Sequence, residues 1–144
     1  MTPTPSDDIA ARMTAEGWSI VPDDGFIAYV GPFWHRIEDN ADVYAVATDA
    51  RHKNRRGLVQ GGLLMTFADR TLGMTARIAS GAAAVATIQL DTHFIDAGRI
   101  GDLLISRPQV VRTTRTLIFL RTDITADGRV VSSSNAVFKT VRHS

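Results

Sequence analysis

The hydrophobic pattern of the chain is dominated by one long helical segment, from Gly61 or Gly62 to about Ser80. It contains no proline, and only three of its side chains are charged. Apolar residues therefore cover much of the circumference of the predicted helix, and Gly81 follows as a stop signal. A helix that is apolar on most sides is expected to be largely buried.

The segment after this helix has the pattern of β-strands up to the end of the chain. The apolar face of the first strand consists of Ala86, Ile88, Leu90 and Phe94. Asp127–Gly128 is a favoured hairpin turn between the last two strands. The predicted strands are Ala86 to Phe94, Asp102 to Thr113, Arg115 to Thr125 and Arg129 to Val141.

The segment between Gly17 and the long helix predicts two further strands and a loop. Aromatic and β-branched residues from Phe26 to Trp34 favour a strand, and the alternation from Asp42 to Thr48 favours another. The stretch from Asp49 to Gly57 is polar and basic, so we expect it to form a loop.

The N-terminal residues predict a short helix after a frayed end. Met1 to Ser6 is polar and rich in proline, and Met1 to Asp8 lacks the basic start and apolar core of a signal peptide. Ile9 to Glu16 has a helical pattern, with Ser6 or Asp7 as its cap and Gly17 as its stop.

The order of these elements predicts the fold class. Consecutive strands joined by short turns imply an antiparallel sheet. A sheet accompanied by one long apolar helix can bury both by curling around that helix. We therefore expect an α+β architecture in a single domain of 144 residues, with the helix as its filling. Self-association would bury a sheet face that remains uncovered.

The composition restricts the chemistry. The formal net charge is +1, which argues against a global field for nucleic acid or an anionic membrane. The chain has no cysteine, which excludes disulfides, cysteine-based metal centres and a thiol nucleophile. No apolar stretch reaches the roughly 18–20 residues that a membrane span needs. We expect a soluble, cytoplasmic protein.

Asp69 is the most informative residue of the predicted helix. Its helical neighbours three and four positions away are uncharged, so no such ion pair within the helix explains it. An ionised carboxylate on an apolar face is costly unless water solvates it or it takes part in the protein's chemistry, so Asp69 is a candidate functional residue. The alternative to a functional role is that Asp69 lies at the surface, or that it pairs with Arg70 or a distant arginine.

Gln60, Gly61 and Gly62 stand at the start of this helix. The first turn of a helix leaves backbone N–H groups without partners at the positive end of the helix dipole. Two glycines let a ligand approach that backbone, where the N–H groups could stabilise an oxyanion. The alternative is that the glycines serve only a tight turn or close packing.

The loop from Arg51 to Gly57 is strongly basic. Its cations could bind phosphate groups, as in coenzyme A, through His52, Lys53, Arg55 and Arg56. A solvated basic loop is the usual alternative, and a nucleic-acid patch is a third. The four histidines are scattered, so we expect no metal site.

Taken together, these residues resemble a known family. Asn54-x-x-Gly57-x-Val59-Gln60-Gly61-Gly62, with Asp69 farther along the helix, resembles the hotdog-fold acyl-CoA thioesterases, most closely the PaaI-type branch of the phenylacetate pathway. Gly31 to Trp34, Thr87 to Phe94 and Gly101–Asp102 resemble further parts of that family. The resemblance implies a curved antiparallel sheet wrapped around one central helix.

The resemblance also implies a role for each matching residue. Asp69 would be the general base or nucleophile, and Asn54 would help to place water or substrate. Gly61 N–H would polarise the thioester carbonyl, and Thr87 matches a hydroxyl position near the site. The family's site lies at a dimer interface, so a homodimer or homotetramer is implied, with Asp69 from one subunit and Asn54 and Gly61 from its partner.

One position departs from the family pattern, because Gln60 replaces the usual histidine before the two glycines. Glutamine can position a carbonyl but cannot titrate near neutral pH. We expect hydrolysis of an acyl-CoA thioester to an acid and free coenzyme A, without metal or bound cofactor. The acyl group would lie near Gly62, Met65 and Leu72. Two alternatives are a non-catalytic acyl-CoA binding module and a hotdog 3-hydroxyacyl-thioester dehydratase.

Overall fold

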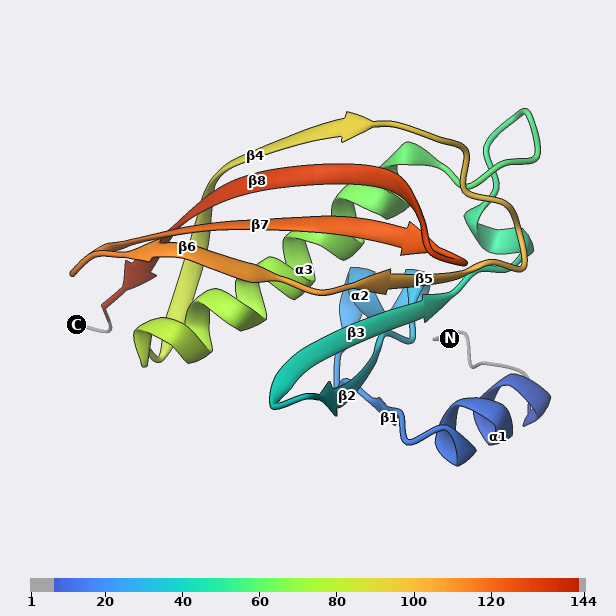
Figure 1. Cartoon of the computed structure of the whole chain (residues 1–144), viewed down its shortest axis with the longest axis horizontal. Helices are drawn as coiled ribbons and strands as arrows, with labels where there is room; N and C mark the ends of the chain where they lie inside the picture. The colour runs from blue at the N-terminus through green and yellow to red at the C-terminus, as the bar shows by residue number, and fades with distance from the viewer. Residues whose placement is uncertain (1–6, 143–144) are drawn as a thin grey trace.

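The computed structural model describes residues 7–142, which form one antiparallel sheet curved around a central helix (Figure 1). The strand order is β1-β2-β3-β5-β7-β8-β4, and β6 also pairs with β7. The predicted α+β class and the curved sheet around one helix are confirmed. No helix in residues 7–142 is long and apolar enough to cross a membrane.

The helices flank and fill the sheet. They are α1 (Asp7–Ala15), α2 (Gly25–Val30), the short 3-10 helix η1 (Ala50–His52) and α3 (Gly61–Ser80). The strands are β1 (Ser19–Ile20), β2 (Trp34–Glu38), β3 (Ala41–Ala47), β4 (Ala84–Phe94), β5 (Leu103–Ser106), β6 (Gln109–Thr113), β7 (Leu117–Ala126) and β8 (Arg129–Val141).

The central helix α3 is buried by the concave face of the sheet, as its apolar circumference predicts. Phe67, Ala68 and Leu72 are fully buried in one cluster with side chains from β7 and β8. Side chains along β7 alternate between buried and half-buried positions, as expected for a strand with one face on the core. Gly81 ends the helix in the left-handed conformation, with φ of 69°.

A chain of buried hydroxyl groups joins α3 to the sheet. Thr71 Oγ1 lies 2.9 Å from Ser106 Oγ on β5, and Ser106 Oγ lies 2.8 Å from Thr122 Oγ1 on β7. Thr71 Oγ1 also donates to the backbone oxygen of Ala68. Because buried polar groups must be satisfied, this chain favours one position of the helix on the sheet.

The prediction of a strand from Phe26 to Trp34 is wrong. Residues 25–30 form α2, and β2 begins only at Trp34. Aromatic and β-branched residues favour strands on average, but partial packing against the core overrides that preference here. Ile27 and Val30, three positions apart on α2, both pack against the main core.

The strands after α3 follow the prediction with one interruption. Asp102 to Thr113 is divided into β5 and β6 around Arg107–Pro108, and both parts pair with β7. Proline has no N–H to donate to a strand ladder, which accounts for the break. The predicted hairpin is present, with positive φ at Asp127 and at Gly128.

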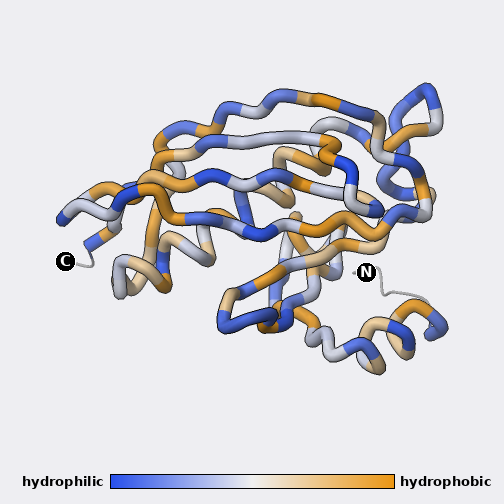
Figure 2. The backbone as a smooth tube through the Cα atoms, viewed as in Figure 1, coloured by the Kyte–Doolittle hydropathy of each residue, from blue (hydrophilic) through white to orange (hydrophobic). Residues whose placement is uncertain are grey.

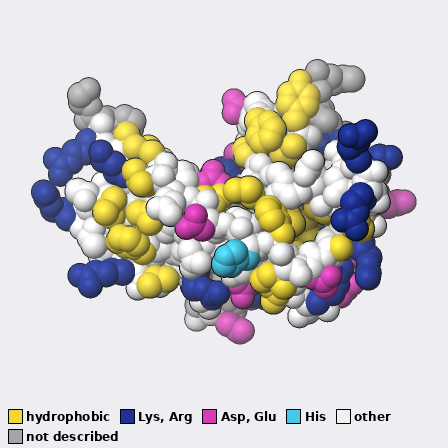
Figure 3. All heavy atoms as spheres, turned by 90° about the horizontal axis from the view of Figure 1, so that it is seen from above, with side chains coloured by type: hydrophobic (Ala, Val, Ile, Leu, Met, Phe, Trp, Pro, Cys, Tyr) yellow, Lys and Arg dark blue, Asp and Glu magenta, His cyan; other side chains and the backbone are white. Residues whose placement is uncertain are grey.

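Strand β4 forms one edge of the sheet. It pairs with β8 through its whole length, and a β-bulge lies between Thr87 and Gln89. Ile88 and Phe94 are exposed, and so is Ile95 directly after the strand. Seen from the side of β4, Figure 3 shows apolar side chains over the middle of this face and basic side chains gathered mainly toward its two ends. A long, exposed edge of this kind can pair with another strand.

The loop before α3 is fixed by a buried histidine. His52 Nε2–H donates to the Val30 oxygen at 2.6 Å, and His52 Nδ1 accepts the Asp49 N–H at 3.0 Å. The backbone oxygen of His52 accepts the N–H of Gln60 at 2.8 Å, so the residue before α3 is tied to η1. Burial lowers the pKa of His52, although the Val30 hydrogen bond and Asp49 oppose this shift.

We predict that the free energy of unfolding decreases as pH falls below the ordinary histidine pKa of about 6.5. In that range the unfolded chain binds a proton at His52 that the folded chain binds less well, so unfolding is favoured. The contribution of neutral His52 to the free energy of unfolding is complete above this pKa, and it is lost as pH falls toward the lowered pKa of His52 in the folded state. Urea unfolding at several pH values should give a steeper dependence for the unmodified chain than for His52→Asn, and equal dependences would contradict the prediction.

Candidate functional site

The carboxylate in the middle of α3 is held by a hydroxyl group from β4. Thr87 Oγ1 donates to Asp69 Oδ1 at 2.6 Å, and Asp69 is half-buried. Arg70, which was a possible partner of Asp69, instead contacts Asp23, with 2.9 Å between Nη2 and Oδ1. Within residues 7–142, no ion pair joins a cation to Asp69. The carboxylate is therefore positioned without being neutralised.

A cavity of about 290 Å³ lies beside this pair and is called the Asp69 cavity below. Gly73 and Arg77 line it from positions one and two turns beyond Asp69 on the same face of α3. Its residues are Asp69, Arg70, Gly73, Met74, Arg77, Ala83, Ala84, Val85, Thr87 and Phe138. Arg77 was not among the predicted site residues, although its spacing from Asp69 on the helix places it on the same side.

The start of α3 presents free backbone donors. Leu63 and Leu64 N–H groups bond to the Gln60 oxygen, whereas the described residues offer no partner to the N–H groups of Gly61 and Gly62. The Gln60 side chain is exposed and makes no capping hydrogen bond. Unpartnered N–H groups at the positive end of a helix dipole can hold a negatively charged oxygen.

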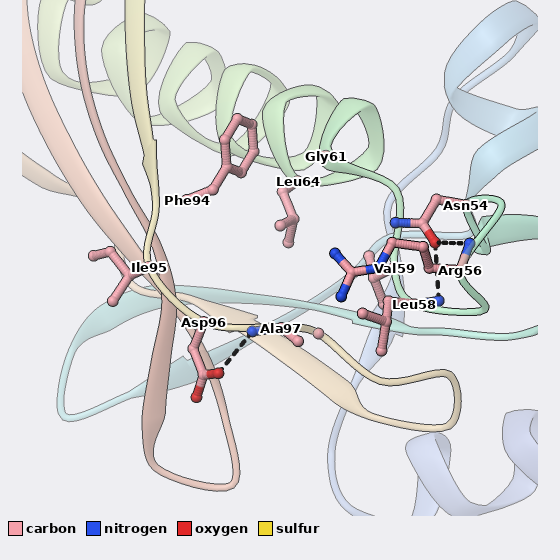
Figure 4. Close-up of a pocket in the computed structure, with 11 residues that line it drawn as sticks. Asn54, Arg56, Leu58, Val59, Gly61, Leu64, Phe94, Ile95, Asp96 and Ala97 are labelled. Carbon is pink, nitrogen blue, oxygen red and sulfur yellow. Dashed lines mark hydrogen bonds between the residues drawn. The ribbon is translucent and has the colours of Figure 1, made fainter.

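A second cavity, of about 440 Å³, opens at this helix start and is called the Gly61 cavity below (Figure 4). A Cβ atom at Gly61 would lie 3.1 Å from the ring of Phe94, so the ring and the helix backbone are in close contact. Phe94 was assigned only to a strand face by the sequence. The residues that line the cavity are Asn54, Arg56, Leu58, Val59, Gly61, Leu64, Phe94, Ile95, Asp96, Ala97 and Gly98.

Asn54 uses one end of its amide to shape the loop. Its Oδ1 accepts the N–H groups of Arg56 at 2.8 Å and Leu58 at 3.1 Å (Figure 4). An amide has both acceptor and donor atoms, so the Nδ2 group remains a donor that a ligand in the Gly61 cavity could use. The described contacts thus give Asn54 a structural role and leave room for the predicted one.

The basic side chains of the loop from Arg51 to Gly57 fall into two groups, those with structural contacts and those that are accessible. Figure 2 shows it as a hydrophilic projection at one end of the sheet. Arg51 donates to the Tyr29 and Gly31 oxygens, and both ring nitrogens of buried His52 are engaged. The assignment of His52 to substrate binding is therefore not supported. Accessible cations remain at Lys53, Arg55 and Arg56, of which Arg56 lines the Gly61 cavity.

The residues predicted to surround the acyl group lie in different places. Leu72 is fully buried in the core and lines neither the Asp69 cavity nor the Gly61 cavity, because its face of α3 points into the sheet. Met65 is half-buried and lines neither the Asp69 cavity nor the Gly61 cavity. Gly62 is exposed at the helix start.

The two halves of the candidate site are far apart within one chain. Asp69 lies eight positions after Gly61 on α3, which corresponds to about 12 Å at a rise of about 1.5 Å per residue. A single thioester carbonyl cannot contact both groups at that separation. Among the described residues, no group of three or more histidines and acidic residues is arranged to hold a metal ion.

Comparisons with known proteins agree on one family. Residues 56–133 match the family described as the Thioesterase superfamily. This segment includes Gln60, Gly61, Asp69 and Thr87, and it begins just after Asn54. The curated Pseudomonas aeruginosa protein named "Putative esterase PA0474" is 30% identical over 111 residues, which are 76% of this chain and 83% of that protein.

Solved structures share the fold. The phenylacetic acid degradation protein PaaI from Thermus thermophilus, solved as a mutant, is 17% identical with a TM-score of 0.72 over 82% of this chain and 100% of its own. A hypothetical thioesterase from Streptococcus pneumoniae, solved with coenzyme A, is 24% identical with a TM-score of 0.69 over 76% of this chain and 88% of its own. Two further structures of the pneumococcal protein carry alanine in place of an aspartate and of a threonine.

The resemblance drawn from the motif between Asn54 and Asp69 is thereby confirmed at the level of family and fold. The chain belongs to the thioesterase superfamily and has the hotdog fold.

Proposed function

We propose that the protein hydrolyses an acyl-CoA thioester to a carboxylic acid and free coenzyme A, with Asp69 as its catalytic carboxylate. The observation that carries this proposal is the contact between Asp69 and Thr87 at the wall of a cavity. A carboxylate that is fixed by a hydroxyl and lacks a cationic partner is available to a substrate.

The orientation of the carboxylate supports a defined role for each oxygen. Thr87 occupies Oδ1, so Oδ2 is the oxygen that takes a proton from water or attacks the thioester carbon. In the first route, water oxygen bonds to the carbonyl carbon while its proton passes to Asp69. The carbonyl oxygen becomes negative and is stabilised by the Gly61 N–H of a second subunit. The carbon–sulfur bond then breaks, and the thiolate of coenzyme A takes up the proton.

The separation of about 12 Å between Asp69 and Gly61 supports a site shared by two subunits. The exposed edge of β4 carries Thr87 near its start and Phe94, which covers Gly61, at its end. Antiparallel pairing of two copies along β4 would bring the start of one strand to the end of the other. Asp69 and Thr87 of one subunit would then face Gly61 of the partner.

The Gly61 cavity suits the coenzyme A end of the substrate. Asn54 Nδ2 and Arg56 line it, and Lys53 and Arg55 are exposed on the same loop. Arginine binds phosphate groups well because it presents several N–H donors in a fixed plane. The pneumococcal relative has been solved with coenzyme A, which agrees with this assignment for the present chain. The proposed reaction needs no metal or bound cofactor.

A non-catalytic acyl-CoA binding module is the second candidate function. Gln60 favours it, because an exposed glutamine without capping contact offers no titrating group at the helix start. Release of free thiol from acyl-CoA distinguishes the two functions directly. Because the chain has no cysteine, a thiol reagent reports only coenzyme A.

We predict that Asp69→Asn lowers kcat/KM for acyl-CoA hydrolysis by at least about 100-fold, because the amide cannot accept the proton or attack the carbonyl. Thr87→Val should lower it by about 10-fold, since the carboxylate loses one hydrogen bond that fixes its orientation. Thiol release and thermal unfolding should be measured on each variant. Near-normal hydrolysis by a folded Asp69→Asn variant would contradict the role of Asp69. Thr92→Val, on the same strand but outside the cavity, is the control for Thr87→Val.

We predict that two inactive variants restore activity when their subunits are combined. Gly61→Pro removes the N–H donor at the first helical position, where proline is compatible with a helix. Gln60 already has the extended conformation, with ψ of 133°, that a following proline requires. Phe94 must move slightly, and its exposure permits this.

A dimer of one Gly61→Pro subunit and one Asp69→Asn subunit retains one unmodified site if sites are shared. Random mixing should therefore restore about one quarter of the normal activity. Co-expression with two different affinity tags isolates the mixed dimer. If each chain holds a complete site, the mixed dimer stays inactive although both proteins are folded.

We predict that Gly73→Ala makes the protein more stable and less active. Glycine inside a helix costs up to about 1 kcal/mol relative to alanine. An added Cβ would lie 3.6 Å from the Phe138 ring, an ordinary contact, so the fold accepts it. It would, however, reduce the Asp69 cavity. Thermal unfolding and kcat/KM for a bulky acyl group test this, and a decrease in stability would contradict it.

A further inference from the structure

The Asp69 cavity contains a cation that the proposed reaction does not use. Arg77 lies eight positions after Asp69 on α3, and its side chain is exposed. It lines the Asp69 cavity and also a neighbouring cavity of about 390 Å³ that contains Tyr44, Asp42 and His35. Arg70 and Met74 line both cavities as well, so the two spaces adjoin along the C-terminal half of α3.

The carboxylates of this region are engaged by other groups. Asp69 accepts a hydrogen bond from Thr87, and Asp42 lies 2.7 Å from His35 Nε2. Asp23 pairs with Arg70, so that arginine is also occupied. Within residues 7–142, no ion pair and no hydrogen bond connects the Arg77 guanidinium to another residue. Arg77 is thus the cation of this wall that a ligand can bind.

Apart from the charged side chains and Thr87, the residues that line the cavity are apolar or glycine. Gly73 leaves open space one turn beyond Asp69, and Met74, Val85 and Phe138 form much of the wall. A ligand that fills this space therefore meets a carboxylate at one end, an apolar middle and a guanidinium at the other end. The carbonyl end of an acyl group belongs at Asp69 in the proposed function.

We propose that Arg77 binds a carboxylate at the far end of the acyl group, so that the preferred substrates are coenzyme A thioesters of short dicarboxylic acids. This inference rests on the proposed thioesterase function and names its substrate class. A guanidinium and a carboxylate form two parallel charge-assisted hydrogen bonds, which a neutral acyl chain cannot provide.

The spacing limits the length of the acyl group. Asp69 and Arg77 are about 12 Å apart along the helix axis. Side chains on a helix lean toward its N-terminus, which brings the guanidinium nearer to Asp69 than the backbone spacing suggests. About 3 Å at each end is taken by the contacts themselves. The remaining span fits glutaryl or adipyl groups and is too short for long dicarboxylic chains.

A purely structural role for Arg77 would have different consequences for stability and for substrate preference. An arginine in the last turn of a helix stabilises the helix dipole whatever the substrate is. Removal of its charge would then lower thermal stability and affect all substrates equally. Recognition of a distal carboxylate affects one class of substrate and leaves its neutral counterpart unchanged.

The experiment compares substrates of equal length, glutaryl-CoA with pentanoyl-CoA and adipyl-CoA with hexanoyl-CoA, for the unmodified chain and three variants. Thiol release gives kcat/KM, and calorimetry on the Asp69→Asn background gives Kd without turnover. We expect the unmodified chain to prefer the dicarboxylic substrates by at least about 10-fold. Arg77→Gln should abolish this preference with less than a threefold change for the neutral substrates, and Arg77→Lys should retain part of it. Arg12→Gln, an exposed helical arginine outside both cavities, is the matched control.

The outcomes separate this inference from the function on which it rests. Hydrolysis of neutral acyl-CoA without a dicarboxylic preference, or an equal loss for both classes in Arg77→Gln, overturns the role of Arg77 and leaves the thioesterase intact. If no thioester is hydrolysed, the proposed function fails. Binding of adipyl-CoA and hexanoyl-CoA to the unmodified and Arg77→Gln chains then decides the question for Arg77.

Discussion

The structure depends on the burial of α3 by the curved sheet. Phe67, Ala68 and Leu72 are fully buried, and they fix which side of the helix faces the strands. The hydroxyl chain from Thr71 to Ser106 and Thr122 adds a directional constraint to that apolar contact. Since successive residues on a helix are rotated by about 100°, this choice also sets the direction of Asp69. The carboxylate therefore lies at the boundary of the core, beside the edge strand β4, because its neighbours are buried.

Several features that support the proposed site weaken the isolated fold. Gly73 lies inside a helix, where alanine would be more favourable, and the space it leaves belongs to the Asp69 cavity. The edge of β4 is long and carries exposed Ile88 and Phe94, although a protein that remains a single chain usually protects such an edge. Both features are expected if the second half of the site comes from another subunit, because pairing along β4 would then complete the site and cover the edge.

The sequence was most informative where short-range physics decides the structure. The long helix, the stop at Gly81 and the turn at Asp127–Gly128 follow from periodicity and backbone preference within a few residues. A family resemblance placed Thr87 near the site, but its hydrogen bond to Asp69 was not predicted, since eighteen positions separate them and no local rule connects them. Residues 26–30 were predicted incorrectly, and the buried contacts of His52 were not predicted, for the opposite reason. Their structure depends on contacts with the core and with Val30, which a linear pattern does not contain.

The spacing of charges on α3 connects these constraints to chemistry. If the residue one turn beyond Asp69 were an arginine, the two would form an ion pair at four positions, and both charges would be lost to a ligand. That position is instead Gly73, and the next cation on the same face is Arg77, two turns away. At that distance the two groups are too far apart to neutralise each other through a short contact, and the glycine leaves space between them. The same arrangement leaves Asp69 available at the thioester carbonyl and leaves Arg77 free for a second functional group on the same acyl chain.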